Sequence, residues 1–318
     1  MTNKGLTNYR VYNITLASDF PLDELASLPE GVHDCAVTLQ PARVQNERHD
    51  WFHYWLNEDQ TTHWLSFGRL GGGYLLRFHD RADFLVDVGG RRVECIPAPG
   101  LPPETLRHLL LDQVLPLVLA QQGACVVHAS AVIGPNGAAL AFAAASGFGK
   151  STLASYLARQ GCPLLTDVGV LLTEQDGQTL VVPGYPGARL WEDSLTALFD
   201  GQAALQPYAD YTSKKRLALP FHDLPYGHYT APLGRFYFLT EPRGDDVLQI
   251  TPLPARSAFL ELLTHTFQLD IGNREQLKDN FARFARLTAL PLFYQLSYPR
   301  EWALLPEVGD AILRHAAA

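Results

Sequence analysis

Residues 144–151 read AASGFGKS. An apolar run precedes this segment, and residues 151–160 follow it with apolar side chains at helical spacing. The segment fits the phosphate-loop motif, with Ala144 at the position of its first glycine. A helix that begins at such a loop directs unpaired N–H groups and a positive dipole end toward an anion. We therefore expect a strand, a loop and a helix that together bind the phosphates of a nucleotide.

The positions of this loop predict different contacts. Gly147 and Gly149 let the backbone pass close to phosphate oxygens, Lys150 reaches the β- and γ-phosphates, and the Ser151 hydroxyl ligates Mg²⁺. The expected nucleotide is ATP with Mg²⁺. The residues expected to bind it are Ser146, Gly147, Phe148, Gly149, Lys150, Ser151 and Thr152.

The chain around the loop predicts an α/β fold. Strands are expected at residues 124–133, 138–144 and 163–172, with the helix at 151–160 among them. Later strands and helices alternate up to a last helix near residues 305–315.

The first hundred residues have a different pattern. Residues 9–97 alternate as half-buried strands do, with hairpin turns at the glycines 71–73 and 89–90. A proline-rich stretch at 97–103 predicts a boundary between a mainly β domain, residues 1–100, and the phosphate-loop domain, residues 101–318. The first helix after it, residues 103–122, contains Pro116, which predicts a kink.

One aromatic group stands out in the β region. Its members are Trp51, Phe52, Tyr54, Trp55 and Trp64. The favoured interpretation is the core of a small sheet, and a ligand surface is the alternative.

Composition narrows the possible partners and compartments. Lys and Arg number 25 against 33 Asp and Glu, a formal charge of −8, which argues against general binding to nucleic acid or to an anionic membrane. The polar first ten residues and the absence of a long apolar run predict a cytoplasmic protein. The four widely spaced cysteines predict buried, reduced thiols.

Several segments carry a resemblance to a known family. They read VHASAV (127–132), SGFGKST (146–152), CPLLTD (162–167), PGYP (183–186) and RLW (189–191). Over residues 123–237 the chain resembles the catalytic domain of HPr kinase/phosphorylase. It looks closest to the HPr-kinase-like serine kinases that accompany lasso-peptide gene clusters.

The resemblance implies a fold and an activity. The fold is a P-loop kinase core related to phosphoenolpyruvate carboxykinase. The activity is transfer of a phosphoryl group from ATP, with Mg²⁺, to a serine hydroxyl of a peptide or small protein. The resemblance also implies assembly into homo-oligomers.

Three positions follow from the matched segments. His128 corresponds to a family histidine near the transferred phosphate. Asp167 corresponds to the first of two adjacent aspartates that act at the Mg²⁺ site and as proton acceptor, and its place at the end of an apolar run also indicates a working carboxylate. Val168 stands where the family has the second aspartate.

A basic run, residues 213–217, follows in this acidic chain. Its cations, Lys214, Lys215 and Arg216, are candidates for contacts with the γ-phosphate or an acidic peptide, and a solvated surface run is the alternative. Weaker candidates for phosphate contact are Arg189 and Arg235, and Tyr208 and Tyr211 are candidates for an acceptor groove.

Three hypotheses for function follow. The first is a serine kinase acting on a peptide or small protein. The second, supported by Val168, is a nucleotide-binding pseudokinase. The third is a kinase for a small molecule such as a free amino acid. No guanine-specific Asn-Lys-x-Asp motif is present, which argues against a GTPase.

Overall fold

The computed structural model describes residues 5–43, 50–57, 61–185, 187–200, 205–206, 208–217, 229–244 and 247–318. The chain forms two compact units. Unit 1 comprises Met1–Ala124 with the segments Tyr208–Thr212 and Gln268–Gly272, and unit 2 comprises Cys125–Pro207, Ser213–Phe267 and Asn273–Ala318.

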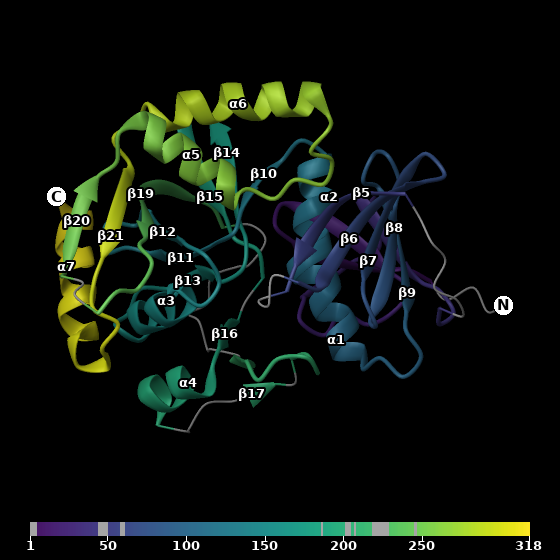
Figure 1. Cartoon of the computed structure of the whole chain (residues 1–318), viewed down its shortest axis with the longest axis horizontal. Helices are drawn as coiled ribbons and strands as arrows, with labels where there is room; N and C mark the ends of the chain where they lie inside the picture. The colour runs from purple at the N-terminus through teal and green to yellow at the C-terminus, as the bar shows by residue number, and fades with distance from the viewer. Residues whose placement is uncertain are drawn as a thin grey trace. The chain divides into compact units, whose positions relative to one another are not determined.

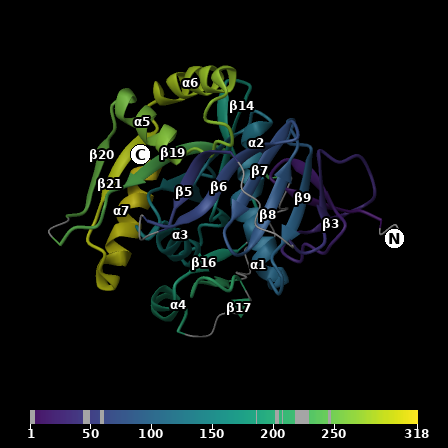
Figure 2. The ribbon, with the colours of Figure 1, turned by 45° about the vertical axis from the view of Figure 1, so that its right-hand side comes forward.

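Unit 1 is built on a nine-stranded sheet in the order β3-β1-β2-β4-β9-β8-β7-β6-β5. Figure 2 shows β5 to β9 side by side. The glycine turns are confirmed: β6 pairs antiparallel with β7 and β8 with β9, with Gly71, Gly72 and Gly90 at positive φ. The strands are β1 (Thr7–Val11), β2 (Ile14–Ser18), β3 (Ser27–Leu28), β4 (Cys35–Leu39), β5 (Trp51–Leu56), β6 (His63–Leu70), β7 (Gly73–Phe78), β8 (Ala82–Val86) and β9 (Arg92–Pro97).

The aromatic side chains of β5 lie outside the core that the sequence favoured for them. Most are half-buried, and Tyr54 is 37% exposed. The reason is position, because β5 is the last strand in the sheet order among the described residues. The core is formed instead by Phe67, Phe78 and Phe84 of the inner strands, all fully buried.

One helix belongs to unit 1, although we expected the boundary at residue 100. It runs as α1 (Pro103–His108), a π-helical turn η1 (Leu109–Val114) and α2 (Leu115–Gln121). Its side chains hold it to the unit: Arg107 Nε donates to the Glu24 carboxylate at 3.0 Å, and Gln122 Nε2 donates to Gly90 O at 2.7 Å. The helix is π-helical just before Pro116, the residue predicted to kink it, which lacks the N–H that an α-helix would use there.

Unit 2 has a second sheet, in the order β10-β14-β15-β19-β12-β11-β13, with β21 paired to β19 and β20 to β21. Strands β12, β19 and β21 run parallel. The strands are β10 (Cys125–Val127), β11 (Ala129–Ile133), β12 (Ala139–Ala143), β13 (Leu164–Thr166), β14 (Val170–Gln175), β15 (Gln178–Val182), β19 (Ala231–Leu239), β20 (Gln249–Pro252) and β21 (Phe293–Ser297).

Helices cover both faces of this sheet (Figure 1). They are α3 (Lys150–Arg159), α5 (Ala255–His265), α6 (Arg274–Thr288) and α7 (Leu305–Ala317), the last preceded by the short η2 (Trp302–Leu304). Side chains alternate along β12: Leu140 and Phe142 pack in the core with α3 and α7, and the alanines between them pack in the core with α5 and α6. The mixed α/β class expected from the sequence is thus observed. A three-stranded sheet, β16 (Ala188–Leu190), β18 (Lys215–Leu217) and β17 (Leu205–Gln206), and the helix α4 (Glu192–Phe199) complete the unit.

Two strands that the sequence predicted as continuous are broken. Residues 124–133 form β10 and β11, which separate at His128, and residues 163–172 form β13 and β14, which separate at residues 167–169. Each half takes a different partner, since β10 pairs with β14 and β11 pairs with β12 and β13. The breaks therefore place His128 and Asp167 where the chain leaves regular sheet pairing.

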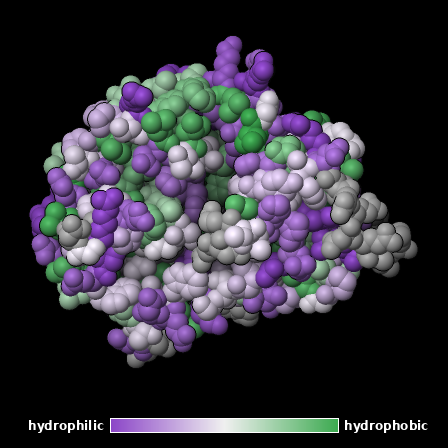
Figure 3. Space-filling view, viewed as in Figure 1, coloured by the Kyte–Doolittle hydropathy of each residue, from purple (hydrophilic) through white to green (hydrophobic). Residues whose placement is uncertain are grey.

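The surface and the thiols complete the description. All four cysteines are buried and free, as predicted. Figure 3 shows hydrophobic surface over α6, where Phe281 is 46% exposed. No helix in the described part of the chain is long and apolar enough to span a membrane.

Candidate functional site

The predicted phosphate loop joins the end of β12 to the start of α3, the strand–loop–helix order expected from the sequence. Gly147 and Gly149 have φ values of 84° and 91°, a region that favours glycine. Gly149 is also the N-cap residue of α3, and a Cβ on Gly149 would lie 3.2 Å from the Tyr298 hydroxyl. The two glycines are thus required by backbone conformation, and Gly149 also by the close approach of Tyr298.

The remaining loop residues differ in exposure. Ser146 and Gly147 are exposed, and Phe148 is half-buried against the core. The Thr152 hydroxyl lies 3.1 Å from that of Ser194 and so links α3 to α4. Ser146 and Gly147 are therefore the residues of the predicted set most open to a ligand.

Lys150 lies under the loop. Its ammonium donates to Ala144 O at 2.8 Å and to Ala145 O at 3.0 Å, and the residue is 6% exposed. Burial lowers the pKa of Lys150 to about 8; the Asp167 carboxylate opposes this shift and the Lys214 ammonium adds to it. The charges of Asp167 and Lys214 therefore both act on the Lys150 ammonium.

Asp167 is held from three sides and is 4% exposed. Ser130 Oγ donates to Asp167 Oδ1 at 2.8 Å, and the Arg189 backbone N–H donates to Oδ2 at 2.7 Å. Burial raises the pKa of Asp167; the Arg189 guanidinium, these hydrogen bonds and one from Ser151 lower it in part. The structure thus brings together Ser151 and Asp167, the two predicted metal ligands.

This donor set fits Mg²⁺. A serine hydroxyl and a carboxylate offer oxygen ligands, and Mg²⁺ commonly binds to one or two carboxylates with phosphate and water oxygens. A cation would also offset the cost of burying the Asp167 charge. The described residues contain no cluster of three or more acidic, His or Cys side chains that could hold a metal ion. Mg²⁺ at Ser151 and Asp167 would take its remaining oxygen ligands from nucleotide phosphates and water.

His128 is half-buried at the break between β10 and β11. His128 directly precedes β11. Two residues further along, in β11, Ser130 donates a hydrogen bond to the Asp167 carboxylate. Its backbone N–H donates to His265 O at 2.7 Å, and its ring lies 6.0 Å from that of Phe267. The role of His128 near a transferred phosphate stays a prediction.

His265 is a residue that the sequence did not single out. Its ring stacks on Phe238 at 6.1 Å, and its Nε2 lies 3.6 Å from a Glu261 carboxylate oxygen. Burial, together with the Lys150 charge, lowers the pKa of His265 to about 4. As the last residue of α5 it gave no signal in the sequence, because a histidine in the last turn of a helix is common.

The three cations of the basic run have different surroundings. Lys214 Nζ lies 5.0 Å from the Trp191 ring centroid, Lys215 is exposed, and Arg216 is 8% exposed. Arg216 and Arg189 are partners across β18 and β16, with their guanidinium carbons 5.6 Å and 4.6 Å from the Tyr185 ring. The solvated alternative thus applies to Lys215 alone.

Other candidates lie elsewhere. Arg235 stacks on Tyr294 at 5.7 Å, on the side of the sheet where Tyr294 contacts His315 of α7. Tyr208 and Tyr211 belong to unit 1. The contacts of Arg235 thus lie outside the loop site, and an acceptor groove at Tyr208 and Tyr211 stays a prediction.

Tyr298 and Arg300 are further residues that the sequence did not reveal. Gly149 lies against the Tyr298 hydroxyl. A Cβ added to Gly149 would also lie 3.8 Å from Arg300 Nε. Arg300 stacks on Tyr298 at 3.7 Å and donates to Thr240 O at 2.8 Å, which places both side chains where β19 and β21 end. Parallel strands bring their carboxyl ends to one edge, but the sequence does not state which strands are neighbours.

Comparisons with known proteins find matches among solved structures only. No family model matches the chain, and no curated protein sequence matches it. A solved structure described as the Hpr(Ser) kinase/phosphatase from Coxiella burnetii aligns with 52% of this chain and 92% of its own, with 13% sequence identity and a TM-score of 0.22. At that score the functional interpretation rests on the geometry of the site.

Proposed function

We propose that unit 2 is an ATP- and Mg²⁺-dependent kinase that phosphorylates a serine hydroxyl of a peptide or small protein. The observation that carries the proposal is the grouping of Lys150, Ser151 and Asp167 at a loop whose glycines have the required backbone conformation. The resemblance of residues 123–237 to serine kinases supports the choice of acceptor.

The residues divide the work of phosphoryl transfer. Backbone N–H groups of residues 146–149 and the start of α3 would bind phosphate oxygens, with Lys150 beside the β- and γ-phosphates. Ser151 and Asp167 would hold Mg²⁺, which neutralises phosphate charge when bound. Lys214 and the Arg189–Arg216 pair supply further positive charge close to Asp167 and Lys150.

The reaction exchanges one phosphorus–oxygen bond for another. The serine oxygen bonds to the γ-phosphorus while the bond to the β–γ bridging oxygen breaks, and ADP leaves. The serine proton must go to a base. Asp167 is the carboxylate beside Ser151, and its raised pKa makes it a stronger base than an exposed aspartate.

A pseudokinase is the second candidate, and Val168 favours it. Val168 is half-buried in the break after β13, where the related kinases have a second carboxylate. Without it, Asp167 must serve both the metal and the proton, and loss of a general base costs about 10²–10⁴ in rate.

One assay separates these candidates. We expect wild-type protein to transfer label from γ-labelled MgATP to a serine-containing peptide, and not to the matching alanine peptide. Val168→Asp should raise the rate at least tenfold by restoring a base. Lys150→Ala should abolish transfer, and Lys278→Ala, at an exposed lysine of α6, should leave it unchanged.

The outcomes have distinct meanings. Tight nucleotide binding without transfer by wild-type protein, and with transfer by Val168→Asp, indicates a pseudokinase. Label on free serine but not on peptide indicates a small-molecule kinase. Transfer unaffected by Lys150→Ala contradicts the assignment of the loop.

A further inference from the structure

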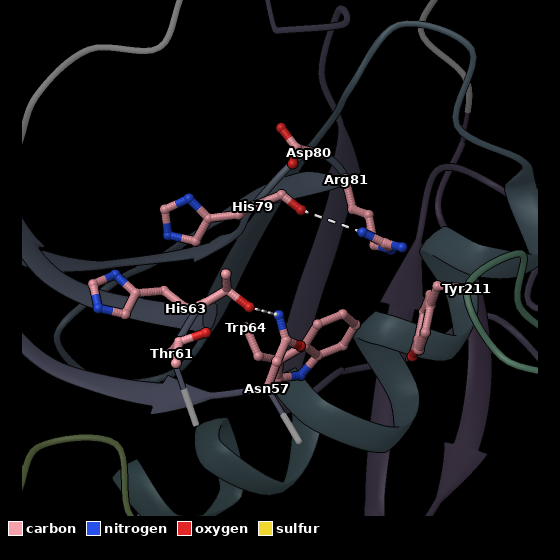
Figure 4. Close-up of a pocket in the computed structure, with 9 residues that line it drawn as sticks. Asn57, Thr61, His63, Trp64, His79, Asp80, Arg81 and Tyr211 are labelled. Carbon is pink, nitrogen blue, oxygen red and sulfur yellow. Dashed lines mark hydrogen bonds between the residues drawn. The ribbon is translucent and has the colours of Figure 1, made fainter. Parts of the chain in front are cut away.

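Unit 1 contains a pocket that the phosphate-loop chemistry does not use. It encloses about 520 Å³, within the range of about 300–1,000 Å³ typical of ligand sites. Figure 4 shows its side chains converging from β6, the turn after β7 and the segment at Tyr211. The lining residues are Asn57, Thr61, Thr62, His63, Trp64, His79, Asp80, Arg81 and Tyr211.

Arg81 is the central charge of this pocket. Its guanidinium carbon lies 5.5 Å from the Trp64 ring and 4.7 Å from the Tyr211 ring, and the two rings lie 4.7 Å apart. Such stacking fixes the plane of the guanidinium in advance, which lowers the entropy cost of binding a planar anion.

The partners of Arg81 leave this charge without a counter-ion. Its one hydrogen bond is from Nη1 to His79 O at 3.4 Å, and within the described residues no carboxylate lies at ion-pair distance. Asp80 points away from the two rings in Figure 4. A half-buried cation in this position gains most from an anion that arrives with the ligand.

Apart from Asp80, the other polar side chains that line the pocket offer hydrogen-bonding atoms. Burial and the nearby His63 and Arg77 lower the pKa of His79, so its imidazole is neutral at pH 7, and its Nε2 lies 2.6 Å from Ser66 Oγ. Asn57 and the two threonines add amide and hydroxyl groups. This mixture suits a carboxylate that is attached to a peptide backbone better than a bare ion, which would fill little of the volume.

Tyr211 connects the pocket to the phosphate-loop unit along the chain. Its segment is fixed in unit 1, because Thr105 Oγ1 donates to Asp210 Oδ1 at 3.1 Å and Tyr208 OH donates to the buried Asp112 at 3.2 Å. Three residues after Tyr211 comes Lys214, whose charge acts on Lys150. A ligand of the pocket is thus bound by a segment that leads directly into the basic strand.

We propose that this pocket binds an aspartate or glutamate side chain of the acceptor peptide, with its carboxylate on the Arg81 guanidinium. The identity of the peptide as acceptor rests on the proposed kinase function. The binding of an acidic peptide does not, and can be measured without nucleotide.

The test uses the full chain and two fluorescein-labelled peptides, one of alternating glycine and aspartate and one of alternating glycine and asparagine. Fluorescence anisotropy should show the aspartate peptide binding at least tenfold more tightly. Arg81→Gln should weaken that binding about tenfold or more, because it removes a charge-assisted hydrogen bond pair. Arg81→Lys should lie between, since lysine keeps the charge but loses the planar fork.

The matched control is Arg91→Gln, at an exposed arginine of the same unit outside the pocket. It should bind the aspartate peptide within twofold of wild type. Affinity for MgATP should be the same in all variants, which also shows that each one folds. Equal binding of the two peptides, or equal losses from Arg81→Gln and Arg91→Gln, would overturn the proposal.

Failure of the kinase function would look different. Binding that depends on Arg81 without phosphate transfer to any serine peptide would uphold the pocket and reject the kinase. Transfer to a serine peptide with no preference for acidic sequence would uphold the kinase and reject the pocket.

Discussion

The position of Lys150 could be predicted from the sequence, but its contacts and its pKa could not. The motif placed it after Gly149, but its two hydrogen bonds to loop carbonyls and its lowered pKa depend on the folded loop. Gly147 and Gly149 were predictable because their conformations are local. Arg300, Tyr298 and His265 were not, since they reach the site from strands and helices far along the chain.

The pKa of Lys150 predicts a pH dependence of nucleotide binding. With a folded-state pKa of about 8, Lys150 carries its proton below pH 8 and loses it as the pH rises through that value. Bound phosphate favours the ammonium, so binding above pH 8 must take up a proton. The ATP affinity should therefore fall by up to roughly tenfold per pH unit above pH 8.

Titration calorimetry from pH 7 to 9.5, in buffers of different ionisation enthalpy, measures both the affinity and the proton uptake. Lys150→Met should bind ATP more weakly and with a flatter pH profile above pH 8. The same steep profile in Lys150→Met would assign the proton to another group.

At the scale of elements, periodicity predicted most strands and helices of unit 2 but not the two strand breaks. Residues 124–133 and 163–172 are continuous apolar runs, and a buried strand that changes partner looks the same in sequence as one that does not. His128 and Asp167 lie in these two breaks, so two of the predicted catalytic residues lie where regular strand pairing ends. Asp167 accepts hydrogen bonds from Ser130 and from the Arg189 backbone. These contacts also depend on the tertiary structure, so the sequence did not predict them.

The segment leading into β18 predicts unequal roles for adjacent lysines. Lys214 lies beside Trp191 and its charge acts on Lys150, whereas Lys215 is exposed. Lys214→Gln should weaken ATP binding about threefold to tenfold relative to ADP, as expected for loss of one charged contact. Lys214→Gln should also raise the pKa of Lys150 in the pH profile, because it removes a neighbouring cation.

Lys215→Gln is the control, since it removes the same charge from the next residue. Both variants can be compared by the ratio of ATP to ADP affinity. Equal effects of the two substitutions would show that the run acts only through overall charge.

At the scale of the whole molecule, the chain combines a β unit and an α/β unit, as composition and motif predicted. The division differs from the expected one at residue 100, because the helix at residues 103–121 and two later segments belong to unit 1. The sequence indicates the proline-rich break. It does not indicate that two later segments of the chain belong to unit 1. Assembly into oligomers stays a prediction.

The central claim is that the loop at residues 144–151 and Asp167 form one site for a nucleotide with its metal. The most direct test is calorimetric titration of ATP with and without Mg²⁺ into wild type, Asp167→Asn and the control Asp176→Asn. Asp176 is an exposed turn residue with φ of 51°, a conformation that asparagine tolerates well. We expect Mg²⁺ to strengthen ATP binding at least tenfold in wild type and Asp176→Asn and to have little effect in Asp167→Asn; an equal gain in all three proteins would contradict the account.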